Sequence, residues 1–350
     1  MNKLSSIYLD LLRFSAAVLV LLYHATRVYK IDIPFISLFG KEAVVVFFVL
    51  SGYVISYVVT TKEKNASSYF SARFIRIFSV MIPALFFTYI CDKIGFHINS
   101  EYYINARHFD GLHPFSSLLR IVFFTGELLN SHLVFGTNEP IWSIQFEFVY
   151  YLAFGVVIYC KNLFFKFIIL ILLAVLAFPK VLMYFPVWLL GAVIYKFQFK
   201  MLDRYAGVIF PLSIALIIAL SIVHLPKLDM FYEMKLSLYN IASIVYYYII
   251  GVLVAINIYS AKYFFEKSNA RFFLVSYERS IRWLASKTFS LYLIHLPLMF
   301  LLISLDPPES YLYIYIQLSA IVIVCFLFSS LFESKSSLFY RFLSKVIKFR

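Results

Sequence analysis

Ten long runs of apolar residues constrain the fold of this chain more than any other feature. A run of about 20 apolar residues crosses roughly 30 Å of hydrocarbon as a helix, and a helix pairs its own backbone polar groups where no water is present. The sequence therefore predicts an all-α, polytopic membrane protein. The expected spans are residues 8–28, 42–60, 75–91, 141–160, 164–179, 182–199, 207–224, 238–259, 286–304 and 311–331.

The composition supports this class, and the basic residues predict the orientation. Hydrophobic residues make up 63% of the chain and charged residues only 14%, whereas a soluble domain is about half apolar and a quarter charged. Cytoplasmic loops carry the excess of lysine and arginine. We therefore expect both termini in the cytoplasm, on the side of the basic block formed by Lys262, Lys267, Arg271, Arg279, Arg282 and Lys287.

Two further segments are not expected to cross the membrane. Residues 117–129 are apolar but short and contain two charges, and a re-entrant or interfacial position on the outer side keeps the later basic loops inside. Residues 335–350 are expected to form a basic amphipathic cytoplasmic tail on the inner leaflet, after a transmembrane domain of residues 1–334. The outer region 92–140 lacks the spacing typical of metal ligands, so no metal site is expected from its histidines, His97, His108, His113 and His132.

Four ionisable residues lie along one face of the first span. Arg13 and His24 are eleven residues apart, which places them about 20° apart around a helix and ~16 Å apart along it. Asp10 and Arg27 fall near the same arc. A charge within the bilayer costs at least a few kcal/mol unless it faces a partner or water, so such residues usually mark a functional site. A purely structural ion pair between Asp10 and Arg13 is the alternative.

Polar residues also occur inside two later spans. Glu147 lies six residues into the fourth span, with Ser143 one turn before it, and its carboxylate needs a partner such as His24 or Arg13. In the ninth span, His295 is either a hydrogen-bonded packing residue or a catalytic one. These positions suggest a buried site shared by several helices.

The other candidates allow two interpretations each. Ser51 and Gly52 either permit close helix packing or contribute to a site. Trp142 is an interfacial anchor or a site residue. Arg73 and Arg76, one turn apart, are ordinary cytoplasmic arginines or a paired guanidinium fork for a ligand that carries phosphates.

In this order, the motifs LDLLRF…YH, FFVLSGYVIS, RFIR, IWSIQFE and SLYLIHLP resemble the integral-membrane acyltransferase-3 family, from residue 9 to about 300. The resemblance implies transfer of an acyl group, often acetyl, from cytoplasmic acyl-CoA to a hydroxyl of a glycan or lipid-linked saccharide. It also suggests O-antigen or another bacterial surface polysaccharide as the acceptor, and the bacterial inner membrane as the location.

The resemblance gives roles to the matching residues. His24 is expected to take the hydroxyl proton, because neutral imidazole is the commonest base near neutral pH, and Glu147 is expected to orient it. Arg13 would hold the donor or stabilise charge on the thioester carbonyl. Arg73 and Arg76 correspond to the donor-associated basic pair. Supporting positions are expected at Asp10, Ser51, Trp142, Ser143 and His295.

A proton-coupled exporter of a glycan or small molecule is the alternative function. An intramembrane arginine, histidine and glutamate would also serve such a transporter, although no inverted repeat is visible in the sequence. For the enzyme we expect acyl-CoA, glycan and membrane lipid as partners, with no permanently bound cofactor and no nucleic acid. The acyl chain, the acceptor sugar and its hydroxyl, and the oligomeric state stay open. So does the choice between direct transfer and a covalent acyl-histidine intermediate.

Overall fold

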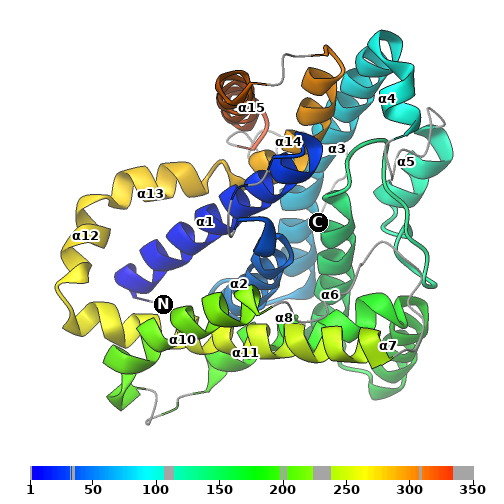
Figure 1. Ribbon diagram of the computed structural model, residues 1–350. Coiled ribbons are helices and arrows are strands. Elements are labelled where there is room, and N and C mark those ends of the chain that lie inside the picture. Colours follow the sequence, from blue (N-terminus) through cyan, green and yellow to red (C-terminus); the bar gives the residue numbers. More distant parts are fainter. Residues whose placement is uncertain are drawn as a thin grey trace.

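The architecture comes from a computed structural model that describes residues 2–31, 33, 36–105, 114–197, 199, 203–223, 238–306 and 310–333. Within these ranges the regular secondary structure is helical (Figure 1). The helices are α1 (Lys3–Val28), η1 (Ile36–Leu38), α2 (Gly40–Thr61), α3 (Ala66–Ile98), α4 (Ser100–Ile104), α5 (Pro114–Val122), α6 (Ile141–Tyr159), α7 (Leu163–Ala177), α8 (Lys180–Lys196), α10 (Ala206–Ile222), α11 (Leu238–Lys267), α12 (Ala270–Ser276), α13 (Glu278–Ala285), α14 (Thr288–Ile303) and α15 (Tyr311–Leu331).

In the described residues, six single helices are long and apolar enough to cross a membrane, and two bent helix pairs raise the number to eight. The prediction of an all-α, multi-pass membrane protein is therefore confirmed in its coarse form. The expected spans 164–179 and 182–199 correspond to α7 and α8, which are bent by 117° at a short break and count as one pair. α7 has 15 residues and is only about 22 Å long, which is shorter than the hydrocarbon core.

The other differences concern lengths and segments outside the description. The expected span 75–91 is part of α3, which has 33 residues and begins where the Asn65 side chain accepts a hydrogen bond from the backbone N–H of Ser68. The expected span 207–224 corresponds to α10, a shorter apolar helix. The tail at 335–350 and two of the outer histidines, His108 and His113, lie outside the described residues. The cytoplasmic placement of the termini stays a prediction.

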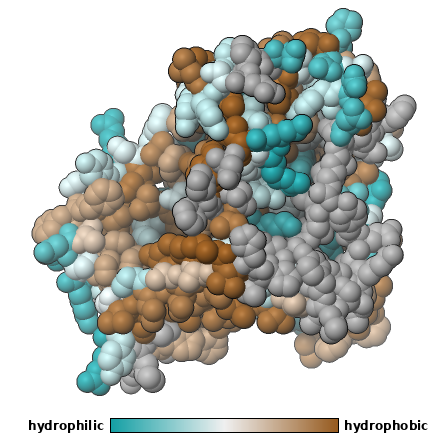
Figure 2. All heavy atoms as spheres, viewed as in Figure 1, coloured by the Kyte–Doolittle hydropathy of each residue, from teal (hydrophilic) through white to brown (hydrophobic). Residues whose placement is uncertain are grey.

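α1 occupies the middle of the helix bundle, where it contacts α2, α11, α13 and α14 (Figure 1). The helices around it present apolar side chains outward, and Figure 2 shows hydrophobic residues gathered over the face formed by α10 and α11. On α10, the exposed side chains include Val208, Leu212, Ile214, Leu216 and Ile218. An apolar outer surface is what a bilayer requires of the lipid-facing side of a bundle.

α2 and α8 pack closely together at two glycines, Gly52 and Gly191. A Cβ atom added to Gly52 would lie less than 3.0 Å from the carbonyl oxygen of Trp188, and one added to Gly191 would lie equally close to the carbonyl oxygen of Val49. Small residues allow helix backbones to approach closely in membranes. The packing interpretation of Gly52 is therefore confirmed, and it fixes the position of its neighbour Ser51 on α2.

The connection from α5 to α6 is fastened to the end of α3 and to α14. The hydroxyl and the backbone N–H of Thr137 donate to the Asp92 carboxylate at 2.6 and 2.9 Å, and the Asn138 amide donates to Thr88 and to the carbonyl of Leu293. α5, the only helix in segment 117–129, has nine residues, too few to cross a bilayer. A segment that does not span agrees with the sequence prediction.

A buried ion pair, Lys180 with Glu127, also stabilises the connection between α5 and α6. The Lys180 ammonium lies 2.5 Å from the Glu127 carboxylate, and His132 contacts the other oxygen of that carboxylate at 2.6 Å. Lys180 and Glu127 are both almost completely buried. The pair joins the start of α8 to the loop that precedes α6.

Candidate active site

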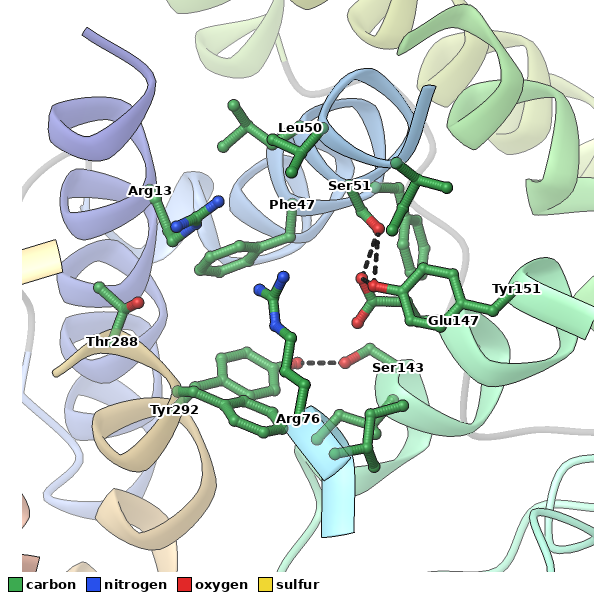
Figure 3. Close-up of a pocket in the computed structure, with 16 residues that line it drawn as sticks. Arg13, Phe47, Leu50, Ser51, Arg76, Ser143, Glu147, Tyr151, Thr288 and Tyr292 are labelled. Carbon is green, nitrogen blue, oxygen red and sulfur yellow. Dashed lines mark hydrogen bonds between the residues drawn. The ribbon is translucent and has the colours of Figure 1, made fainter. Parts of the chain in front are cut away.

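A polar pocket lies inside the bundle where α1, α2, α3, α6 and α14 meet (Figure 3). It contains about 780 Å³ of empty space, part of which is open to solvent. The pocket combines apolar walls with polar groups from all five helices. Its polar lining consists of Arg13, Ser51, Arg76, Ser143, Glu147, Tyr151, Thr288 and Tyr292. Five of the predicted site residues, far apart in sequence, thus meet in one cavity.

Hydroxyl groups hold the Glu147 carboxylate. Ser51 and Tyr151 both donate to its Oε1 atom (Figure 3), and the indole Nε1–H of Trp188 donates to Ser51 at 3.0 Å. Of the two partners expected from the sequence, Arg13 interacts with Glu147 through its charge. His24 forms no hydrogen bond with Glu147 in the described part of the chain, because its ring lies elsewhere in the bundle. The predicted pairing of Glu147 with His24 is therefore wrong.

Two guanidinium groups project into the pocket, Arg13 from α1 and Arg76 from α3 (Figure 3). Arg13 lies 3.7 Å from the Asp10 carboxylate, whose closer partner is Arg282 at 2.9 Å. The structural ion pair considered as an alternative is therefore present, but Asp10 is shared. Arg76 has no carboxylate within 4.0 Å among the described residues, although it interacts over a longer range with Glu147. Guanidinium groups that line a cavity without a close carboxylate partner are suited to binding a phosphate or carboxylate ligand.

Arg73 does not line this pocket. Its guanidinium pairs with Glu63 at 2.5 Å and lies over the ring of Tyr69, 4.4 Å from the centroid. Residues three apart differ by only about 60° around a helix, yet the Arg73 side chain turns to Glu63 while Arg76 lines the pocket. The geometry does not support the interpretation of these two arginines as one fork. Only Arg76 faces the cavity.

His24 packs against His295. Their ring centroids are 5.2 Å apart, and both side chains are buried, with His295 completely so. Neither ring lines the pocket. Tyr292 lines the pocket and lies between it and His295. The Tyr292 hydroxyl hydrogen-bonds with Ser143 at 2.7 Å, and its ring centroid is 6.5 Å from that of His295. The histidine pair therefore lies one layer beyond the pocket, inside the bundle and away from lipid.

The sequence profile of a family described as an acyltransferase domain matches residues 6–332. The chain belongs to the acyltransferase-3 family. The match includes every helix that contributes to the pocket and to the histidine pair. Together with the apolar helices, it identifies a multi-pass membrane acyltransferase. Neither a curated protein nor a solved structure matches the chain significantly.

Trp142 and Asp10 take positions beside the pocket of this acyltransferase-3 protein. The Trp142 ring is buried between Phe48 and Phe146, with centroid distances of 6.2 and 5.0 Å, so it packs inside the bundle. Asp10 bridges α1 to Arg282 of α13. Both residues shape the surroundings of the cavity without lining it.

Three functional candidates in the acyltransferase-3 chain were absent from the sequence interpretation. Tyr151 holds Glu147, Tyr292 separates the pocket from the histidines, and Arg282 shares Asp10 with Arg13. A signal existed for the tyrosines, since Tyr151 lies one helical turn after Glu147 and Tyr292 lies three residues before His295. For Arg282 the sequence indicates only a place in the basic block.

Proposed function

We propose that the protein is an O-acyltransferase of the bacterial inner membrane that moves an acyl group, acetyl in the simplest case, from cytoplasmic acyl-CoA to a hydroxyl of a cell-surface glycan such as O-antigen. The observation that carries the proposal is the pocket in which Arg13 and Arg76 face a hydroxyl-bound carboxylate among apolar helices. Coenzyme A carries phosphate groups, and guanidinium groups bind phosphates in bidentate geometry.

In this proposal the His24 imidazole acts as the base. It takes the proton of the acceptor hydroxyl while the hydroxyl oxygen bonds to the thioester carbonyl carbon. The carbon–sulfur bond then breaks, the acyl group stays on the acceptor as an ester, and the proton passes to the coenzyme A sulfur to give the free thiol. Because Arg13 lies ~16 Å from His24 along α1, Arg13 is assigned in this proposal to the donor and not to the thioester carbonyl.

The arrangement supports a donor that extends along α1. Arg13 and His24 are ~16 Å apart along the helix, and Tyr292 separates the pocket at one end from the histidines at the other. Donor phosphates at Arg76 therefore require the pantetheine arm to pass Tyr292 so that the thioester reaches His24. The acceptor hydroxyl approaches from the opposite end.

The experiment that tests the function uses the purified protein in lipid nanodiscs with radiolabelled acetyl-CoA and the glycan acceptor. We expect label to appear on the glycan without any ion gradient, and His24→Ala to abolish this while leaving the protein monodisperse in the nanodisc. An exporter would need a gradient and would modify nothing. Absence of transfer by the wild-type protein, or full activity of His24→Ala, would overturn the proposal.

A second measurement tests the donor pocket. Arg76→Glu should weaken coenzyme A binding in titration calorimetry about 10- to 150-fold, because a hydrogen bond to a charged group is worth roughly 1.5–3 kcal/mol. Arg271→Glu is the matched control, since Arg271 is exposed on α12 outside the pocket. Equal affinities for the two variants would contradict the assignment of the pocket to the donor.

A further inference from the structure

The proton position on His295 can be inferred from its neighbour on α14. Its Nδ1 atom lies 2.9 Å from the carbonyl oxygen of Leu291, one helical turn earlier. A carbonyl oxygen only accepts hydrogen bonds, so Nδ1 must carry the proton and donate it. In a neutral imidazole the other nitrogen, Nε2, is then an acceptor. A neutral ring is favoured because a charged one, completely buried, would need compensation.

The acceptor Nε2 of His295 has no partner. It is buried and unpaired among the described residues, and an unpaired buried polar atom costs about 1–3 kcal/mol. Of the two aromatic neighbours at His295, the ring of His24 is closer, at 5.2 Å between centroids, than that of Tyr292, at 6.5 Å. The nitrogens of His24 also form no hydrogen bond within the described part of the chain. At this centroid distance a nitrogen of each ring reaches hydrogen-bond distance when the two nitrogens face one another.

We propose that His295 is the positioning residue for His24. Its Nε2 accepts the N–H of His24, which leaves the second nitrogen of His24 unprotonated and directed toward the acceptor hydroxyl. When that nitrogen takes the hydroxyl proton, both nitrogens of His24 carry hydrogen, and His295 stabilises the resulting cation as a hydrogen-bond acceptor. The proton then leaves to the coenzyme A sulfur. The inference rests on the proposed function, and it gives His295 the orienting role that the sequence suggested for Glu147.

Two substitutions separate this role from helix packing. His295→Gln can place an amide oxygen near the position of Nε2 and so keeps an acceptor for His24. His295→Asn can keep the hydrogen bond to the Leu291 carbonyl but is too short to reach His24. A positioning role predicts that the Gln variant retains a substantial share of kcat, whereas the Asn variant loses about tenfold or more, with KM for acetyl-CoA unchanged. A purely structural role predicts the reverse order or equal losses, and either result overturns the inference.

A spectroscopic readout keeps the inference separate from the activity. Nitrogen-15 NMR of histidine-labelled protein in lipid reports which ring nitrogen carries hydrogen. We expect the wild type to show His295 protonated at Nδ1 and the N–H of His24 donating to Nε2 of His295. His295→Asn should change the His24 signals. His24 signals that are identical in wild type and His295→Asn would overturn the inference even if transfer is observed. Wild-type protein that shows the predicted signals but transfers no label would contradict the proposed function alone.

Discussion

Adding one methyl group at Gly52 should loosen the contact between α2 and α8. In Gly52→Ala the new Cβ atom would lie less than 3.0 Å from the Trp188 carbonyl oxygen, and the amide nitrogen of Ala192 is also within 3.4 Å. These neighbours are backbone atoms within helices, which cannot turn aside as a flexible side chain can. The two helices must therefore separate by several tenths of an ångström or more.

The expected cost follows from this overlap. Extra methyl groups in a well-packed core destabilise by typically about 1–3 kcal/mol, which corresponds to a 5- to 150-fold change in the folding equilibrium. The displacement also affects the pocket, because Ser51 adjoins Gly52 and accepts a hydrogen bond from Trp188 at 3.0 Å. We therefore expect Gly52→Ala to lower both thermal stability and the rate of acyl transfer.

Tryptophan fluorescence during thermal unfolding in nanodiscs measures the effect, since the chain has three tryptophans and Trp188 is completely buried at this contact. Gly207→Ala is the control, because a Cβ atom at Gly207 on α10 meets no other atom within 4 Å. The control should melt at or above the wild-type temperature. The reasoning is refuted if Gly52→Ala melts at the same temperature as Gly207→Ala.

Two further predictions concern the ion pairs. Lys180→Met should destabilise the protein by about 3–5 kcal/mol, because it removes the ammonium partner of the buried Glu127 and leaves, among the described residues, only His132 at the other carboxylate oxygen. Adding Glu127→Gln should recover part of the loss in the same melting assay; no recovery would show that packing dominates there. Arg282→Ala should weaken coenzyme A binding several-fold in calorimetry. Without Arg282, Asp10 pairs with Arg13 alone and offsets the positive charge of Arg13. Unchanged affinity would mean that Arg13 does not contact the donor.

The apolar runs predicted α1, α2, α6 and α15 well, because the length of a run directly reflects the thickness of the bilayer. The bend between α7 and α8 could not be predicted in this way. Two apolar runs separated by a short break have the same composition whether they form two separate spans or one bent pair. Hydropathy carries no information about the angle between them.

The candidate site was partly predictable for a similar reason. A charged residue inside an apolar run stands out, so Arg13 and Glu147 were found and do meet in the pocket. Tyrosine does not stand out in a chain with 28 of them, so Tyr151 and Tyr292 were missed. The neighbour of His24 depends on how α1 packs against α14, which the sequence does not specify, so the sequence pointed to Glu147 and not to His295.

The hydrogen bond between Tyr292 and Ser143 has a consequence for the cell as well as for the chemistry. Under the proposed function, a charged nucleotide enters from one side of the membrane and a sugar from the other, so hollows would open toward both sides. If the two hollows joined, ions would cross and the membrane potential would fall. In the proposed function, the ring of Tyr292 would let a slender thioester arm through while it blocks a continuous column of water, and the membrane would stay sealed between turnovers.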